Sequence, residues 1–131
     1  MLTEDYCDFE TAKLLKEKGF DEICYLGYNK NGEYVPTSNR TNSQIIQPDF
    51  CFICCPTLQM AMKWLREVHN IFIEINIIPH TTVTMEQEYY FFKSYKDRRP
   101  HNFPLNFSVK SYSSYEEACE DAIKYCLENL I

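Results

Sequence analysis

The sequence predicts an α+β fold in which amphipathic helices pack on one face of a mainly antiparallel sheet of about three to five strands. The main observation is a change of hydrophobic period at Asn70. Before Asn70 the apolar residues recur at helical spacing, whereas over 71–77 they alternate, which is typical of a strand. Three predicted strands, beginning with this one, are joined by modest loops and favour an antiparallel meander. The expected order of elements is α-ββ-α-βββ-α.

Size and composition indicate one globular unit, and we expect a single domain over 1–131. Hydrophobic residues make up 45% of the chain and charged residues 24%, which argues against general disorder. The formal charge is −6, so the chain lacks the broad basic face that nucleic acids select. No apolar stretch approaches the ~20 residues that span a bilayer. The acidic N-terminus lacks the pattern of a secretory signal, and a cytoplasmic location is expected.

The first helix is expected from about Asp8 to Lys18. Asp8 is a suitable N-cap because its carboxylate can accept a hydrogen bond from the first turn. Gly19 can adopt the left-handed conformation that ends many helices, and Phe20 can then fold back onto Leu15.

A β-hairpin is predicted after this helix. Residues 23–28 are rich in strand-forming side chains, and Asn-Gly at 31–32 is the strongest two-residue turn signal. Residues 33–35 begin the return strand. The polar segment 36–49 contains Asn, Ser, Thr and Pro and is predicted to be a loop.

The apolar run 50–54 leads into a second helix, for which Thr57 is the predicted N-cap. Asn70 can end this helix in the left-handed conformation. In the strand 71–77 one face is expected to be core and the other at least partly exposed. The apolar stripe of the helix comprises Leu58, Ala61, Met62, Leu65 and Val68.

Two further strands are predicted after a turn at 79–87. The segment 88–96 is aromatic on both faces, and the basic segment 97–102 is predicted to be a turn. Residues 103–109 alternate cleanly and predict a third strand. Pro104 favours the edge of the sheet for this strand, because proline cannot donate to a ladder.

The last helix begins at a capping box, formed either by Ser113 with Glu116 or by Ser114 with Glu117. Acidic pairs such as residues 120–121 are expected on its solvent side, where they serve capping and solubility rather than proton transfer. The predicted apolar stripe comprises Tyr115, Ala118, Cys119, Ala122, Ile123, Cys126, Leu127 and Leu130.

Cysteines offer the first candidate chemistry. Cys51 and Cys54 form a C-x-x-C before the second helix, with Cys55 beside them, and a helix N-terminus lowers the pKa of a thiol. No thioredoxin-like βαβ pattern precedes them, so buried thiols are favoured over redox function. A ligand or metal site at 51–55 is the alternative hypothesis, although structural zinc needs two closely spaced ligand pairs. The histidines are isolated from one another: His69, His80 and His101.

The only dense basic segment holds Arg98 and Arg99, beside aromatic residues. Such a combination can contact phosphates and stack on bases, which makes nucleic-acid binding a weaker alternative. A solvated charged turn is the commoner explanation, and Asp97 weakens the patch. The chain has no Gly-rich phosphate loop and no G-x-S-x-G, so we assign no cofactor and no catalytic residue, and an enzyme is disfavoured.

A non-enzymatic interaction or accessory protein is therefore the leading hypothesis. Its partner is an unidentified protein, and a second copy of the chain is one candidate. The expected recognition surfaces are the segment 36–49 and the aromatic strand 88–96. The residues expected to take part are Tyr89, Phe91, Tyr95, Arg98 and Arg99.

Three segments, 10–20, 56–67 and 114–131, resemble a group of short uncharacterised proteins from gut Bacteroidales genomes. Their genes often lie near phage or mobile-element genes. The similarity covers both ends and the centre of the chain, whereas 29–55 and 79–112 differ more. The group carries no activity, so no catalytic residue is transferred. The resemblance implies a small cytoplasmic accessory protein.

Overall fold

The computed structural model describes residues 1–46, 50–78, 89–101 and 110–131. Within these ranges it contains three α-helices, one short 3-10 helix (η1) and two antiparallel sheets of three strands each. The elements in chain order are α1 (Phe9–Glu17), β1 (Cys24–Tyr28), β2 (Tyr34–Arg40), η1 (Asn42–Gln44), β3 (Ile53–Cys54), α2 (Leu58–His69), β4 (Ile71–Ile77), β5 (Tyr90–Lys96), β6 (Arg99–His101) and α3 (Tyr115–Asn129).

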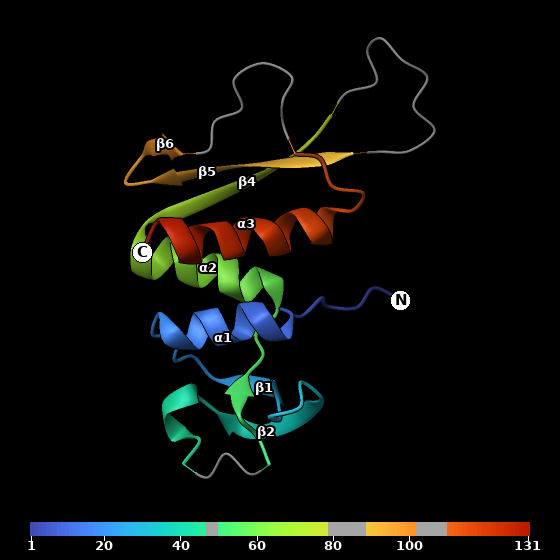
Figure 1. Cartoon of the computed structure of the whole chain (residues 1–131), viewed down its shortest axis with the longest axis vertical. Helices are drawn as coiled ribbons and strands as arrows, with labels where there is room; N and C mark the ends of the chain where they lie inside the picture. Colours follow the sequence, from blue (N-terminus) through green and yellow to red (C-terminus); the bar gives the residue numbers. More distant parts are fainter. Residues whose placement is uncertain (47–49, 79–88, 102–109) are drawn as a thin grey trace.

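The predicted α+β class is confirmed, and the predicted order of elements agrees in outline. The strands form two separate sheets, in the orders β2-β1-β3 and β4-β5-β6. The helices lie between these sheets (Figure 1). We call β4-β5-β6 the larger sheet and β2-β1-β3 the smaller sheet, after the lengths of their strands. α2 and α3 cover one face of the larger sheet, as expected, while α1 lies against α3 and β3. The helical layer therefore supplies the apolar surface that both sheets need.

Helix α1 begins and ends as predicted. The carboxylate of Asp8 accepts a hydrogen bond from the backbone N–H of Thr11 at 2.8 Å. Gly19 has a φ of +92°, and the N–H of Phe20 donates to the carbonyl of Leu15 at 2.9 Å. This is the Schellman ending, in which glycine adopts the left-handed conformation without a Cβ clash.

The return strand of the first hairpin is longer than predicted. β2 continues to Arg40, so the expectation of a loop from residue 36 was wrong for residues 36–40. Ser38 and Asn39 have φ values of 57° and 58°, and the β1–β2 pairing contains a register shift. The hydroxyl of Thr37 donates to the carbonyl of Cys24. Tertiary pairing thus makes an irregular strand from residues whose composition indicates a loop.

Asn70 ends α2 as predicted, with φ 54° and ψ 39°. At the other end of the helix, Thr57 accepts from the N–H of Met60 at 3.1 Å. Val68 was expected in the apolar stripe but is 57% exposed. The buried face turns instead toward Trp64, which lies at the core side of the last turns.

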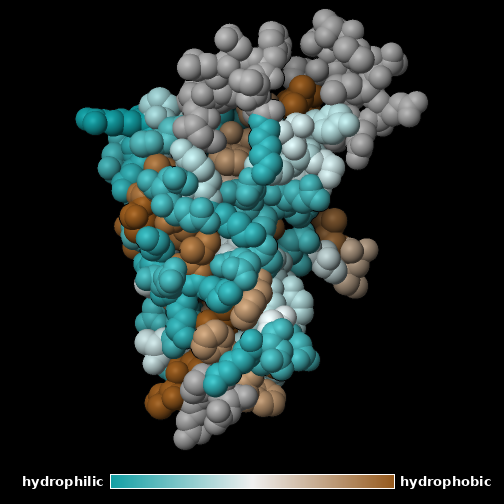
Figure 2. Space-filling view, in the orientation of Figure 1, coloured by the Kyte–Doolittle hydropathy of each residue, from teal (hydrophilic) through white to brown (hydrophobic). Residues whose placement is uncertain are grey.

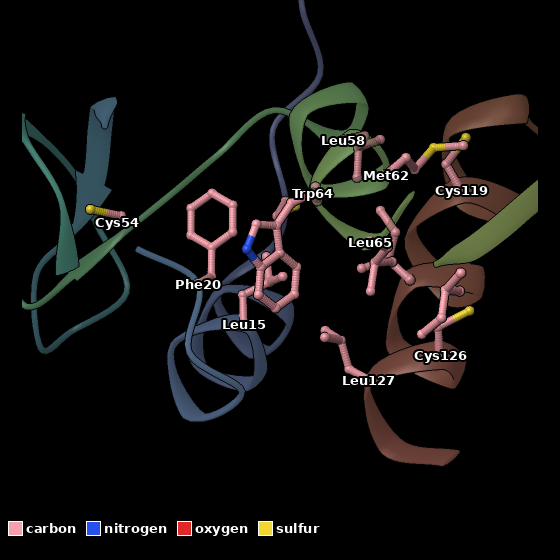
Figure 3. Close-up of a cluster of buried hydrophobic side chains, with 14 of the residues drawn as sticks. Leu15, Phe20, Cys54, Leu58, Met62, Trp64, Leu65, Cys119, Cys126 and Leu127 are labelled. Carbon is pink, nitrogen blue, oxygen red and sulfur yellow. The ribbon is translucent and has the colours of Figure 1, made fainter. Parts of the chain in front are cut away.

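The largest group of buried side chains lies between the helices. Figure 3 shows Leu65 and Leu127 meeting between α2 and α3, while Phe20 lies against Trp64 on the α1 side. The rings of Phe20 and Trp64 are 5.4 Å apart in an edge-to-face arrangement. The predicted stripe of α3 is buried except for Tyr115, which is partly exposed.

The capping alternatives of α3 are resolved by its first turn. Ser114 accepts from the N–H of Glu117 at 3.1 Å, so the second of the two predicted boxes supplies the N-cap. The hydroxyl of Ser113 donates to the carboxylate of Glu117 at 2.9 Å. Both serines therefore satisfy groups at the start of the helix.

The predicted turn 97–102 is instead a tight hairpin. Asp97 and Arg98, with φ values of 51° and 65°, make the turn, and β6 pairs with β5 from Arg99 onward. Positive φ at both central residues matches the twist of the flanking strands. The predicted turn 79–87 and the predicted strand 103–109 lie outside the described residues.

We expect Asn70→Val to lower the free energy of unfolding by about 1–2 kcal/mol, because a β-branched residue is strained at a left-handed φ. Asn70→Gly should cost less, since glycine accepts this backbone. Both variants lose the hydrogen bond from Asn70 to Asp97, which makes them a matched pair. Urea unfolding followed by circular dichroism measures the difference. Equal midpoints for the two variants would contradict the prediction.

Candidate functional site

The outer face of the larger sheet gathers several of the predicted interaction residues. Helices cover the face that carries Ile71 and Phe92, so the alternate residues lie on the opposite face. In the register of β4 and β5, each residue of one strand lies opposite a residue of the other on this face. The outer face consists of the pairs Phe72 with Tyr95, Glu74 with Lys93 and Asn76 with Phe91.

A hydrogen bond connects β4 and β5 on the outer face. The hydroxyl of Tyr95 donates to the carboxylate of Glu74 at 3.0 Å. Burial and this hydrogen bond raise the pKa of Tyr95. Phe72 remains 43% exposed, and Ile77 at the end of β4 is 53% exposed. The surface is therefore amphipathic, with aromatic and aliphatic side chains beside a charged pair.

Arg98 and Arg99 are exposed at the β5–β6 hairpin, at one end of the same sheet. Their neighbours are engaged within the chain: Lys96 donates to the carbonyl of Leu130, and Asp97 accepts from Asn70 at 3.1 Å. The structure thus brings the predicted residues to one sheet: Tyr89, Phe91, Tyr95, Arg98 and Arg99.

The described part of the other predicted surface, residues 36–46, lies at the far end of the molecule, on and beside the smaller sheet (Figure 1), and 47–49 lie outside the described residues. Hydrophobic residues reach the surface at this end as well (Figure 2). The exposed large side chains there are Ile23, Tyr25, Tyr34, Ile46 and Phe50. The two predicted recognition surfaces are therefore separate.

The edges of the two sheets differ in how they are protected. β2 contains Pro36 and the two residues of positive φ at 38–39, β3 has two residues, and β6 has three residues including Pro100. Such features prevent an edge strand from pairing with another chain. β4 has seven residues in regular register, without proline, lysine or bulge. Among the described residues, its backbone pairs with β5 alone.

The hydrogen-bond phase of β4 determines which groups face its open edge. Ile78 donates to the carbonyl of Tyr89 at 2.8 Å, and Asp97 donates to the carbonyl of Asn70 at 3.1 Å. Antiparallel strands alternate between bonded and non-bonded pairs, so the even-numbered residues of 70–78 bond to β5. The odd-numbered residues direct their N–H and C=O groups to the open edge, and all four are isoleucines: Ile71, Ile73, Ile75 and Ile77.

Comparison with known proteins gives no relative to guide the interpretation. No family model, curated protein or solved structure matches this chain. The resemblance to the Bacteroidales group therefore stays a prediction, and the functional argument rests on the geometry of the chain. In the part of the chain that the structure describes, no helix is long and apolar enough to cross a membrane.

The candidate cysteines are buried and point to different partners. Cys54 contacts the thiol of Cys24 in the main core, and Cys55 donates to the carbonyl of Cys7 at 3.3 Å. The thiol of Cys51 packs against Gly27, where an added Cβ atom would lie 2.5 Å from the sulfur. Across residues 1–46, 50–78, 89–101 and 110–131, no group of three or more Cys, His, Asp and Glu side chains is placed to hold a metal ion.

The pKa values of these thiols follow from their surroundings. Burial raises the pKa of Cys51, and it raises the pKa of Cys55 to about 12. The hydrogen bond with Cys24 lowers the pKa of Cys54 and raises that of Cys24. Cys54 is thus the thiol that ionises most readily, but it is 1% exposed. Reaction there requires local opening of the chain.

We expect the folded protein to react slowly with Ellman's reagent, whereas all seven thiols react in urea. Brief treatment with N-ethylmaleimide followed by peptide mapping should find Cys54 labelled before Cys51 and Cys55. Its lower pKa supplies the larger thiolate fraction during local opening. Rapid labelling of Cys51 or Cys55 in the folded chain would contradict this and revive the ligand-site hypothesis.

A carboxylate that sequence reasoning placed in solvent joins the two ends of the chain. Glu120 accepts from the N–H of Asp8 at 2.8 Å and from the hydroxyl of Thr11 at 2.6 Å. Asp8 in turn pairs with Lys124 at 2.7 Å. The expectation for Glu120 was wrong because α1 packs on this side of α3. A signal was present: Thr11 faces the core side of α1, and its hydroxyl needs a buried partner there.

The two carboxyl groups of this cluster differ in pKa. Burial raises the pKa of Glu120 despite the hydrogen bonds it accepts. Burial acts in the same sense on Asp8, but the hydrogen bonds from Lys124 and Thr11 lower its pKa overall. A cavity of about 540 Å³ between α1 and β3 is lined by neither carboxylate. The cluster therefore connects the start of α1 to α3.

We expect Glu120→Gln to be more stable than the wild type at neutral pH, and Glu120→Ala to be less stable by about 1–3 kcal/mol. The amide oxygen of Gln keeps both hydrogen bonds, whereas Ala leaves two donors unpaired. The pKa of Glu120 is raised in the folded state, so protonation of this carboxyl group stabilises the fold. That stabilisation of the wild type is lost as pH rises through the folded pKa. Urea unfolding at several pH values measures the difference. A Gln variant whose advantage does not grow as pH rises above 4.5 would oppose this view.

Proposed function

We propose that the chain is a non-enzymatic protein-interaction module that accepts an extended strand of a protein partner along β4. The supporting observation is the contrast between edges: β2, β3 and β6 are short or interrupted, while β4 is long and regular and, among the described residues, pairs with β5 alone. Added strands gain affinity from main-chain hydrogen bonds and specificity from alternate side chains. Both requirements are met by an edge with four outward-facing backbone positions.

The side chains of β4 provide specificity on both faces of an added strand. On the helix side the strand would meet isoleucine side chains, of which Ile77 is the most exposed. On the outer face it would meet Phe72 and the Glu74–Tyr95 pair. Arg98 and Arg99 lie beyond β5 from this edge and are not part of the proposed contact.

The alternatives have less support. A ligand or metal site at 51–55 would need convergent, accessible thiols, and these thiols are buried with separate partners. Nucleic-acid binding through Arg98 and Arg99 is opposed by a formal charge of −6. A cytoplasmic accessory role near mobile elements is a proposal that rests on the resemblance alone.

Peptide display on the purified chain tests the proposed function. We expect selected peptides to alternate apolar and polar residues, and Ile77→Lys to weaken their binding about tenfold, because the ammonium replaces an exposed apolar contact on the helix side of the added strand. Ile23→Lys is the matched control, since Ile23 is 58% exposed and Ile77 is 53% exposed. Peptides that bind both variants equally, or that leave amide exchange of β4 unchanged, would argue against the module.

A further inference from the structure

We infer that the open edge of β4 pairs antiparallel with β4 of a second copy of the chain, about a two-fold axis beside Ile75. The inference rests on the proposed function, because it names the strand that the edge accepts. Three properties of residues 71–78 point to it: the phase of the backbone hydrogen bonds, the position of the one charged residue and the exposed apolar side chains.

The hydrogen-bond phase limits the registers that two β4 edges can adopt. A two-fold axis brings the same surface of both copies together. Only the odd-numbered residues direct their N–H and C=O groups outward, so bonded pairs across the interface join odd residues to odd residues. Any residue that lies on the axis satisfies this rule. It pairs with the same residue of the second copy, and residues at equal distances on either side of the axis pair with each other.

Charge and length select among these registers. With the axis at Glu74, the two Glu74 carboxylates face one another directly, which is destabilising across strands. With the axis at Ile75, Glu74 of each copy faces Asn76 of the other. An axis at Ile73 or at Asn76 leaves only 71–75 or 74–78 paired, whereas the Ile75 register pairs every residue of 72–78.

The Ile75 register also covers the apolar side chains that one copy leaves exposed. Ile77, 53% exposed, lies opposite Ile73 of the second copy. Phe72, 43% exposed, lies opposite Ile78 of the second copy. Aliphatic and aromatic pairs directly opposite on one face stabilise antiparallel strands. The register at Glu74 would instead place Phe72 against the polar Asn76.

In the assembly the described strands form a continuous sheet of six, three from each copy, with α2 and α3 of both copies on the same side. Pairing removes the open edge of each molecule. Among the described residues, the outer strand at each end of the joined sheet is β6, which is short and contains Pro100. A strand of this kind opposes the addition of a third copy.

Sedimentation velocity over a concentration series tests the association. The mass of the chain should rise from 15.6 kDa toward twice that value with concentration. Ile77→Lys should weaken the association about tenfold, because it places an ammonium opposite the apolar Ile73 of the second copy, while Ile23→Lys leaves it unchanged. A chain that stays monomeric at every concentration, or dimers equally strong in both variants, would overturn the inference.

A pair of substitutions at one position tests the register. Asn76→Lys places an ammonium opposite Glu74 and should maintain or strengthen the dimer. Asn76→Glu places a carboxylate there and should weaken it about tenfold. The two variants disturb the same position in the fold and carry opposite charges. Equal association of the two would overturn the Ile75 register.

Amide hydrogen exchange on the wild-type chain tests the same pairing without substitution. The amides of Ile73, Ile75 and Ile77 should become protected as concentration rises, while those of Glu74 and Asn76 are protected throughout. Odd-numbered amides that exchange freely at high concentration would overturn self-pairing. If the chain stays monomeric but displayed peptides protect these amides, the module stands and the second copy is not its partner. If neither protects them, both proposals fail.

Discussion

The left-handed backbone at Asn70 is the constraint on which the larger sheet depends. It ends α2 and starts β4 with no intervening loop, so the strand must return over the helix that precedes it. The carbonyl and side chain of Asn70 also contact Asp97, which fixes the β5–β6 hairpin to the same corner. One residue thereby sets the direction of β4 and the position of its neighbours. The edge proposed to bind a partner is a product of this geometry.

The seven-residue strand β4 shows how packing and interaction share one segment. Its isoleucines face the helices, and their backbone groups face the open edge. Ile71 is fully buried, whereas Ile77 is exposed, so the same residue type contributes to the core at one end and to the surface at the other. A strand of this kind is stabilised by its own fold and still offers hydrogen bonds outward.

The sequence predicts the local features of this fold well because each depends on neighbouring residues. The caps at Asp8 and Thr57, the Gly19 ending and the left-handed Asn70 are all read from short windows. Its failures depend on distant contacts. Residues 36–40 form a strand because β1 pairs with them, and Glu120 is drawn inward by α1. The open edge of β4 was not predicted either, since strand order is a property of the whole sheet.

The contact between Asp8 and Lys124 has a consequence for the order of folding. These residues are 116 positions apart, and the Thr11–Glu120 bond spans 109. Helix α1 is synthesised before α3 and cannot reach its final partner until α3 has been made. The core is therefore completed only after α3 has been synthesised, and contacts of such long range favour slow folding. Until then, the apolar face of α1 depends on β1 and β3, the elements made soonest after it.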